Sequence, residues 1–402
     1  MYQVSRTVRM IEDILDIVQR HDEWRGKKCI NLIPSENVTS PQVRSLLSSE
    51  MAHRYTSPDH FYMGTRFIDE IEAHGQKIAR ELFKAESADL RPLSGHIADF
   101  IFLASFAKRN SSLICVSASD GGYPGIWKEG LPKVLGIKVH AFPFSKEKMN
   151  IKTDEAVEAI AAVNPSIVVF GASLFRFPHP VHDLAAVAKE MGAEVGFDGS
   201  HVLGLIAGGV FQHPLQEGAH ALFGSTHKSF FGPQGGIMLA DKEHGELMRR
   251  KTNPAFVDNA HWNRIAALTL ALAEMRKFGA PYAKQVILNA QALGEALSDS
   301  GFPVAGAEIG YTESHQVLLD YGGYKKGRDI AARLEMANLI VDCGVRLGTC
   351  EVTRRGMKET EMARIAELIE QVVIKGREPS KVKHDVMQLA SEFSEIEYCF
   401  QK

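Results

Sequence analysis

The sequence predicts an α/β fold in which a mostly parallel, doubly wound sheet is followed by a smaller C-terminal α/β domain. Apolar runs of strand length alternate with helical patterns between residues 113 and 240, as in βαβ units. Two of these runs end in polar residues about thirty positions apart, the separation of one strand–helix–strand unit. A chain of 402 residues also leaves room for two or three domains and a sizeable core.

The composition excludes several classes of protein. Hydrophobic residues make up 45% of the chain and charged residues 24%, which is typical of a soluble globular enzyme. A net charge of −3 gives no electrostatic reason to expect nucleic acid or an anionic membrane as a partner. No apolar run approaches the ~18 residues of a membrane span, and the N-terminus has no signal-peptide pattern. Five scattered cysteines without a C-x-x-C pair favour reduced thiols in a cytoplasm, and no metal site is expected.

The N-terminal region predicts helices and an aromatic loop. Apolar residues at helical spacing over 6–22 indicate a helix that packs on a neighbouring surface, in this chain or in a partner subunit. Ser40 and Pro41 are typical of the cap and first position of the next helix. Residues 54–65 have the composition of a loop, and a helix is expected over 69–85.

The rest of the chain alternates strands and helices. Strands are expected near 113–116, 138–142, 166–171, 194–198, 221–225 and 236–240, with helices near 123–135, 153–163 and 181–191. An alanine- and leucine-rich helix over 263–278 would link the domains. Helices near 282–299, 326–339, 359–375 and 378–392, with short strands, would build the second domain. The predicted division is an N-terminal helical segment 1–52, a large domain 53–262, and a linking helix with a small domain 263–402.

The stretch 224–236 carries the strongest functional signal. An apolar run leads into Lys228, and a Gly/Pro-rich turn follows. A desolvated lysine amine has a lowered pKa and can form a Schiff base with an aldehyde cofactor, although a lone lysine is more often a surface residue. The upstream run ends in Asp198. Right-handed crossovers would bring both residues to the carboxyl edge of one sheet, where an aspartate can keep a pyridine nitrogen protonated.

Together these motifs resemble the serine hydroxymethyltransferase-like enzymes. The resemblance lies in Asp-Gly-Ser-His at 198–201, Ser-Thr-His-Lys at 225–228 and Thr-Arg-Arg-Gly at 353–356, with the stretches 31–37 and 344–349. It covers nearly the whole chain. It implies the pyridoxal-phosphate transferase fold type I, with a seven-stranded, mostly parallel sheet in the cofactor-binding large domain. It also implies pyridoxal 5′-phosphate on Lys228, and a homodimer or higher homo-oligomer with shared active sites.

The resemblance assigns roles to individual residues. Lys228, Asp198, His201, Tyr55 and Asp120 would be catalytic. The residues implied in cofactor binding are Ser94, Gly95, His96, Ser173, Asp198, His201, Ser225, His227, Lys228 and Asn259. Ser35, Tyr55, Tyr62 and Arg354 would bind the substrate, Tyr55 and Tyr62 in the neighbouring subunit's site and Arg354 as the clamp for the carboxylate. The Asn259 region would likewise reach a neighbour's site.

The chain also departs from the family pattern. Asp120 stands where a ring-stacking histidine is usual, and is as well explained as a turn residue; His96 replaces a small hydroxyl residue. Ser57 replaces the glutamate that serves folate-dependent transfer, and the loop before Gly344 looks deleted. Stretches 258–261 and 314–317 resemble threonine transaldolases instead.

These departures decide between several reactions. The sequence slightly favours an aldolase or transaldolase without a normal folate site, which makes or breaks the Cα–Cβ bond of a β-hydroxy-α-amino acid and releases glycine. The alternatives are a glycine hydroxymethyltransferase that uses folate or a modified pterin, an aminotransferase or racemase, and a non-catalytic cofactor-binding protein.

Overall fold

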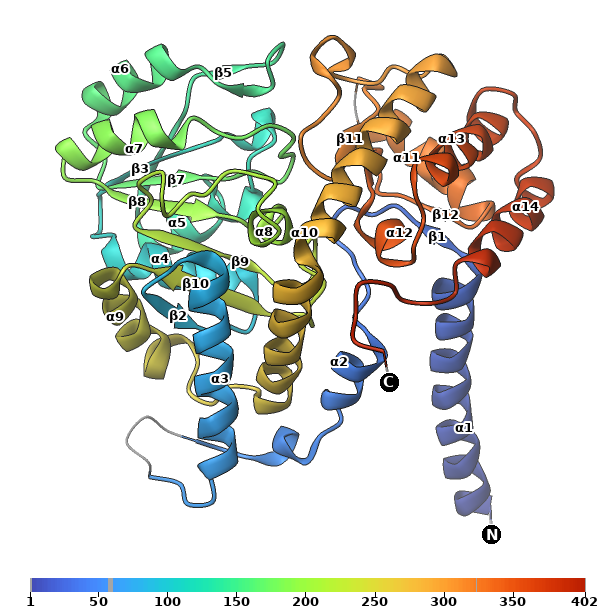
Figure 1. Ribbon diagram of the computed structural model, residues 1–402, viewed down its shortest axis with the longest axis horizontal. Coiled ribbons are helices and arrows are strands. Elements are labelled where there is room, and N and C mark those ends of the chain that lie inside the picture. Colours follow the sequence, from blue (N-terminus) through green and yellow to red (C-terminus); the bar gives the residue numbers. More distant parts are fainter. Residues whose placement is uncertain (1, 57–60, 323, 402) are drawn as a thin grey trace.

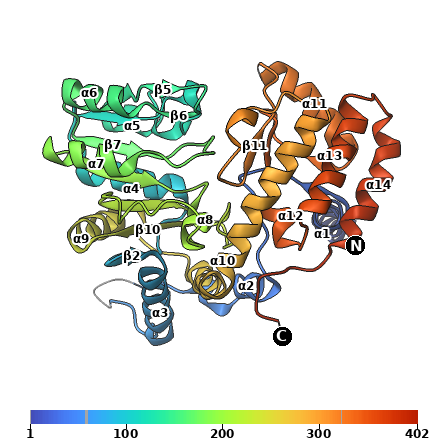
Figure 2. The same cartoon turned by 45° about the horizontal axis from the view of Figure 1, so that its top comes forward.

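The protein is built around a sheet-containing part and a C-terminal part that lie on either side of one long helix. The computed structural model describes residues 2–56, 61–322 and 324–401. The long helix, α10 (Trp262–Asp299), runs between the two parts in both views (Figure 1, Figure 2). The sequence splits this helix around Pro281, but the structure continues it through that proline. One missing N–H does not end a helix that is packed on both sides.

The large sheet has seven strands. Their order is β2 (Ser87–Asp89), β10 (Gly236–Ala240), β9 (Ala221–Ser225), β8 (Glu194–Asp198), β7 (Ile167–Phe170), β3 (Ser112–Cys115) and β4 (Lys138–Ala141). Only β10 runs antiparallel to its neighbours, because the segment from β9 to β10 is too short to hold a crossover helix. The α/β prediction is confirmed, and six of the seven strands lie where the sequence predicts them. The seventh, β2, is too short to give a periodic pattern.

Helices cover both faces of this sheet, and alternate strand residues point to opposite faces. On one face Val168 and Phe170 join a buried cluster with α3 (Arg66–Phe83), α6 (Thr153–Val163), α7 (Val181–Glu190), α8 (Leu203–Ala207) and α10. On the other face Ile167 and Val169 pack with α4 (Gly95–Phe106), α5 (Leu131–Leu135) and α9 (Lys242–Lys251). The helix expected over 123–135 is wrong: two glycines and two prolines in 124–132 leave only the turn η4 (Pro124–Ile126) and α5.

The C-terminal part has its own buried cluster. It contains α11 (Tyr324–Met336), α12 (Cys350–Arg354), α13 (Glu359–Val373) and α14 (Pro379–Glu392), and the antiparallel pair β11 (Gln316–Leu318) and β13 (Arg346–Gly348). The N-terminal strand β1 (Ile30–Asn31) pairs with β12 (Leu339–Ile340). Residues just before the large domain therefore pack with the far end of the chain.

Short elements connect these layers. They are α2 (Pro41–Leu46), the hairpin strands β5 (Phe144–Ser145) and β6 (Asn150–Ile151), and the turns η1 (Trp24–Lys28), η2 (Glu50–His53), η3 (Ala118–Asp120), η5 (Thr252–Phe256) and η6 (Ala307–Ile309). The predicted start of α2 is confirmed, because Ser40 Oγ accepts a hydrogen bond from Val43 N at 3.1 Å.

The first helix, α1 (Tyr2–Glu23), extends away from the rest of the chain (Figure 1). Ile11, Ile14, Leu15 and Val18 are all more than half exposed along it. The described residues thus leave an apolar stripe of this helix uncovered. Within the described part of the chain, no helix combines the length and apolar character needed to cross a bilayer.

A polar cluster joins three elements at the amino edge of the sheet, opposite the strand ends discussed below. Glu194 opens β8, His220 precedes β9, and His244 lies in the first turn of α9. The Glu194 carboxylate lies 3.0 Å from His220 Nδ1 and 2.8 Å from His244 Nε2, and the two imidazole rings stack at 4.2 Å. Among the described residues, these side chains form a group whose potential metal-ligand atoms lie within 4.8 Å of one another. Glu194 and Asp241 both pair with His244, which links the start of β8 to α9.

This cluster predicts a pH-dependent contribution to stability. The two histidines lower the pKa of Glu194 to about 2, so its contribution is present above the unfolded value near 4.5 and is lost as pH falls toward 2. Burial opposes the charge of His244, but Glu194 and Asp241 outweigh it and raise its pKa above 6.5. The histidine contribution is therefore present below pH 6.5 and is lost as pH rises through the folded value.

We expect His244→Gln to lower the melting temperature more at pH 6 than at pH 9, with a loss of about 1 kcal/mol at pH 6. Thermal unfolding at both pH values measures the difference. His182→Gln, at an exposed histidine, is the matched control. An equal loss at both pH values would show that charge pairing is not the cause.

Candidate active site

Lys228 follows β9 on a loop fixed by hydrogen bonds to distant segments. Thr226 N donates to Gly235 O at 3.1 Å and closes the loop. Asn37 Nδ2 donates to the backbone carbonyl of Lys228 at 2.7 Å and also contacts Tyr282 Oη at 2.9 Å. Asn37 thus fixes the lysine backbone from a distant part of the sequence and is itself held by Tyr282, as a residue with a positioned side chain requires.

Asp198 lies at the carboxyl end of the neighbouring strand. It is paired in register with Phe223 of β9 and only 5% exposed, and its Oδ1 accepts from Ser200 N at 2.9 Å. Burial lowers the pKa of the Lys228 amine and the charge of Arg346 adds to this, while Asp198 and Asp99 oppose it. The structure therefore places Lys228 and Asp198 at one edge of the sheet, within electrostatic reach of each other.

The protonation of His201 follows from its hydrogen bonds. Gln316 Oε1 accepts from Phe175 N at 2.9 Å, and Nε2 donates to Ser173 O at 3.0 Å, so the orientation of this amide is fixed. The same Nε2 lies 2.9 Å from His201 Nδ1, which must therefore accept. Burial, then the charge of Lys228, holds the pKa of His201 well below its usual range. His201 is thus a neutral imidazole with its proton on Nε2.

His315, which the sequence analysis gave no role, lies against His201. The two rings are 5.6 Å apart and inclined by 13°. His315 is fully buried, its Nε2 donates to Pro34 O at 3.1 Å, and burial lowers its pKa to about 3. Its Nδ1 is buried without a hydrogen-bond partner in the described structure. This edge of the sheet therefore holds a second neutral imidazole with an unused acceptor.

The N-terminus of α4 meets the ends of β8 and β9. Ser94 caps this 12-residue helix, since its Oγ accepts from Ile97 N at 3.1 Å. Gly95 is packed so closely that an added Cβ would lie 2.3 Å from Ser225 Oγ and 3.0 Å from Ser200 Oγ. The free N–H groups and the positive end of the helix dipole at the start of α4 lie next to the hydroxyls of Ser225 and Ser200. This arrangement suits a phosphate group.

The remaining expected cofactor residues have varied surroundings. His96 is exposed and lies 3.0 Å from Tyr123 Oη. Burial is the main cause that lowers the pKa of His227 to about 4, and the positive charge of Lys228 adds to it. The Nδ1 atom of His227 is buried and has no hydrogen-bond partner among the described residues. Ser35 is half-buried next to Pro34.

Asp120 lies in a turn beside the Ser173 loop. Ser117 Oγ donates to Asp120 Oδ2 at 2.7 Å, and the following Gly121 carbonyl accepts from Ser173 N at 2.8 Å. Gly121 has φ +92°, which only glycine adopts without strain. These contacts support the interpretation of Asp120 as a turn residue, and its catalytic role stays a prediction.

The structure corrects the expected role of Arg354. Its side chain is 0% exposed and its Nη2 pairs with Glu274, also 0% exposed, at 2.8 Å. Nη1 donates to Glu397 O at 2.7 Å, and the guanidinium lies 3.7 Å above the Phe231 ring. A guanidinium enclosed in this way cannot clamp a substrate carboxylate. Arg354 instead joins the C-terminal segment at Glu397 to the lysine loop at Phe231.

A better-placed arginine lies eight residues earlier, in the Gly-Val-Arg-Leu-Gly-Thr stretch. Arg346 Nη1 donates to Ser173 O at 2.8 Å, and its Nε pairs with Asp342 at 2.9 Å. Its side chain is 25% exposed, and its charge contributes to the lowered pKa of both Lys228 and His201. This stretch is part of the family resemblance. The sequence alone does not decide whether Arg346 or Arg354 binds the substrate carboxylate, because both motifs offer the same chemistry.

Three expected residues form a group of their own, and Lys228 does not line the cavity beside them. Tyr55 and Tyr62 are 54% and 40% exposed, with rings 5.6 Å apart, and line a cavity of about 450 Å³ near the start of α3. Asn259 Nδ2 donates to Arg54 O at 3.4 Å in the same region. Ser57, which stands in place of the family's glutamate, is outside the described residues.

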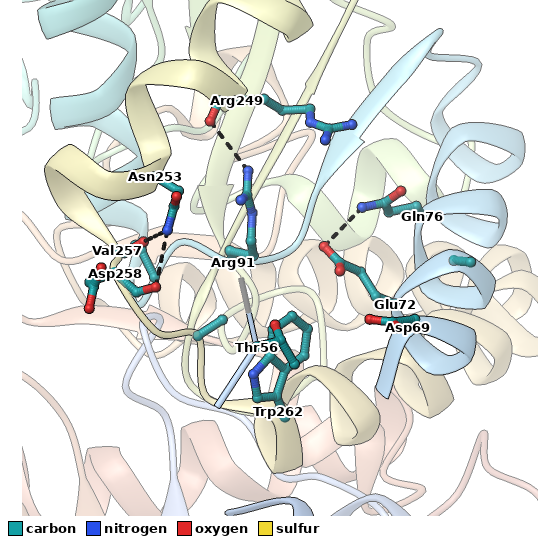
Figure 3. A pocket seen from close by; sticks show the side chains of 12 residues that line it. Thr56, Asp69, Glu72, Gln76, Arg91, Arg249, Asn253, Val257, Asp258 and Trp262 are labelled. Carbon is teal, nitrogen blue, oxygen red and sulfur yellow. Dashed lines mark hydrogen bonds between the residues drawn. The ribbon is translucent and has the colours of Figure 1, made fainter. Parts of the chain in front are cut away.

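A second cavity of about 270 Å³ lies between α3, η5 and the start of α10 (Figure 3). Its polar side chains are largely engaged with one another or with the backbone: Gln76 donates to Glu72 at 3.1 Å, and Asn253 Nδ2 donates to the carbonyls of Val257 and Asp258. Burial raises the pKa of Glu72. Neither Lys228 nor Asp198 lines this cavity. We therefore place the chemistry at the sheet edge.

Comparisons with known proteins identify the family. A family model described as serine hydroxymethyltransferase matches residues 8–369. The chain is 42% identical to a serine hydroxymethyltransferase from Methanocaldococcus jannaschii, over 97% of this chain and 96% of the relative. It is 40% identical to one from Pyrococcus furiosus, with the same coverage. A crystal structure of L-threonine transaldolase from Pseudomonas fluorescens superposes with a TM-score of 0.92 at 26% identity, covering 100% of this chain and 96% of that one.

Proposed function

Because the chain belongs to the serine hydroxymethyltransferase family of pyridoxal-phosphate enzymes, we propose that it is a glycine hydroxymethyltransferase with a folate or modified pterin as one-carbon carrier. The observation that carries this proposal is the 40–42% identity to serine hydroxymethyltransferases along 97% of the chain. These relatives favour the folate- or pterin-dependent alternative over the slight sequence-based preference for a folate-independent aldolase. The residues at the sheet edge fit the cofactor.

Each part of the cofactor has residues that suit it. Ser94 and Gly95, at the N-terminus of α4, would bind the phosphate, and the Asp198 carboxylate would hold the ring nitrogen protonated. Lys228 offers an amine whose pKa is lowered by burial and which is therefore a ready nucleophile for the aldehyde carbon. When bound, pyridoxal phosphate supplies an electron sink that weakens the bonds to the substrate Cα.

The chain's own residues orient the substrate and move protons. The neutral His201 donates from Nε2, toward the phenolic oxygen or the substrate, because Gln316 occupies Nδ1. Asn37 holds the Lys228 backbone in place, which fixes the point from which the amine would reach the cofactor. Asp198 would be held in position for the ring nitrogen by the hydrogen bond that its Oδ1 accepts from Ser200 N.

Arg346 is the residue we propose for the substrate carboxylate, since a guanidinium can bond both oxygens. We expect Arg346→Ala to raise the KM for serine by about 10–100-fold with a smaller effect on kcat, and Arg346→Lys to give an intermediate value. Steady-state kinetics with serine varied measures both constants. Arg377→Ala, at an exposed arginine in the loop between α13 and α14, serves as control. An unchanged KM in Arg346→Ala would remove this residue from the substrate site.

A homodimer with shared active sites remains our proposal for the assembly. Lys228 of the same chain does not line the cavity beside Tyr55, Tyr62 and Asn259, so these residues are free to complete the site of another copy. The uncovered apolar stripe of α1 also favours burial against a neighbour. Analytical ultracentrifugation measures the assembly, and a monomer at working concentrations would exclude sharing.

A threonine transaldolase is the second candidate, supported by the 0.92 TM-score to that enzyme from Pseudomonas fluorescens. One assay separates the candidates: the protein receives serine, threonine or allo-threonine, with and without tetrahydrofolate, and glycine and free aldehyde are measured. Glycine formed from serine only with the carrier supports the hydroxymethyltransferase. Carrier-independent glycine and aldehyde from threonine would support the second candidate, and an oxo-acid product would point to transamination.

A further inference from the structure

Asp99 is a buried carboxyl group that the roles proposed so far leave unused. It lies in α4, is only 1% exposed, and its Oδ1 has no hydrogen-bond partner in the described structure. An ionised carboxylate without a partner in such a place is strongly unfavourable. No sequence pattern marks Asp99, because the recognisable signal in this region is the Ser-Gly pair at the start of the helix.

The packing of α4 fixes where Asp99 lies. Gly95 packs against Ser225 at the end of β9, and Phe102 stacks on Phe223 at 4.7 Å. Asp99 comes four residues after Gly95 and three before Phe102, so all three lie on the face of the helix that covers the sheet. Phe223 is itself the register partner of Asp198. Asp99 therefore faces the ends of β8 and β9, within electrostatic reach of the carboxylate of Asp198.

The charged and titratable groups that face Asp99 come from three segments. They are Asp198 on β8, Lys228 after β9, and Tyr123 in the segment after β3. Burial and the like charge of Asp198 hold the pKa of Asp99 well above its usual range, opposed by Lys228. A raised pKa favours the protonated form of Asp99, which is neutral and can donate a hydrogen bond.

Resting on the proposed pyridoxal-phosphate chemistry, we propose that Asp99 is a neutral carboxylic acid that donates a hydrogen bond to Asp198 and positions that carboxylate for the cofactor ring nitrogen. The pair then carries one negative charge, which balances the single positive charge of a protonated ring nitrogen. Lys228 need not stay protonated to neutralise a second carboxylate. Asp99 is thus a positioning residue that acts through Asp198.

Two variants of Asp99 separate its hydrogen bond from its charge. Asp99→Asn is neutral and of similar size, and can still donate to Asp198; Asp99→Leu is also neutral but cannot. The Kd for pyridoxal phosphate, measured by spectral titration between pH 6 and 9.5, is a readout independent of turnover. Asp385→Asn, on the exposed surface of α14, is the control. Thermal unfolding of each variant reports folding.

We expect Asp99→Asn to keep the Kd within about threefold, with an unchanged midpoint of its pH dependence, and Asp99→Leu to weaken binding by at least about tenfold. A midpoint shift above about one pH unit in Asp99→Asn would show that Asp99 is charged and overturn the proposal. Wild-type binding in Asp99→Leu would also overturn it. If Asp99→Leu does not fold, the Asp99→Asn midpoint decides. A wild-type protein that takes up no cofactor overturns the proposed function as well, whereas the other outcomes concern Asp99 alone.

Discussion

Replacing Arg354 with alanine is expected to unfold the protein or destabilise it by about 3–5 kcal/mol, not to raise the KM for the amino acid. The substitution leaves the carboxylate of Glu274 buried without its partner, and both side chains are 0% exposed. It also frees the Glu397 carbonyl and removes the cation above the Phe231 ring. A loss of this size is a large part of the stability of a typical protein. Thermal unfolding of the purified variant measures it.

A second variant keeps this prediction testable if the alanine variant does not fold. Removing both charges, as in Arg354→Met with Glu274→Leu, should recover most of the stability, because no unpaired ion is then buried. Arg364→Ala breaks an exposed ion pair with Glu392 and should cost at most about 1 kcal/mol. A folded Arg354→Ala variant with normal stability and a raised KM would restore the role that the sequence suggested.

Lys228→Ala is expected to lower kcat by at least about 10³-fold and to abolish covalent attachment of pyridoxal phosphate. The amine is the group that bonds the aldehyde carbon, and the structure holds its backbone through Asn37. Absorbance of the dialysed protein and borohydride reduction followed by mass spectrometry report attachment. Lys228→Arg keeps a positive charge but cannot form the bond, so it should fail in the same way.

The pH dependence of attachment gives a further check on Lys228. Burial lowers the pKa of its amine below the ordinary 10.5, so the nucleophilic form appears at lower pH than for an exposed lysine. The attachment rate should rise with pH and level off below pH 10.5. Lys242→Ala, at a lysine on the surface of α9, should leave attachment unchanged. A normal covalent adduct in Lys228→Ala would refute the role of this residue.

The elements with strong periodic patterns were predictable from the sequence. The helix α6 has the expected bounds, and the central strands were recognised because buried parallel strands are nearly continuous apolar runs. The sequence failed where tertiary packing overrides local signals. Pro281 is a helix-ending signal in the sequence, yet both of its flanks are packed and α10 continues through it. Likewise β1 and β12 have two residues each, and only their pairing across the chain defines them.

The candidate site was predictable in part, for a physical reason. Asp198 ends β8 and Lys228 lies just after the adjacent strand β9, and topology alone brings such positions together. Arg346 and Arg354 have the same chemistry and lie eight residues apart, so only burial distinguishes them. Asp99 and His315 are visible only in three dimensions, because their signal is a buried polar atom without a partner.

The side chain of Asn37 couples the position of the Lys228 backbone to the C-terminal part of the chain. Asn37 lies six residues after β1, and β1 pairs with β12 in the C-terminal part. The side-chain amide of Asn37 donates a hydrogen bond to the backbone carbonyl of Lys228. A rigid rotation of the C-terminal part about α10 would therefore displace the backbone of Lys228 through this hydrogen bond. Relative motion of the sheet-containing part and the C-terminal part would therefore change the position of the nucleophilic amine directly.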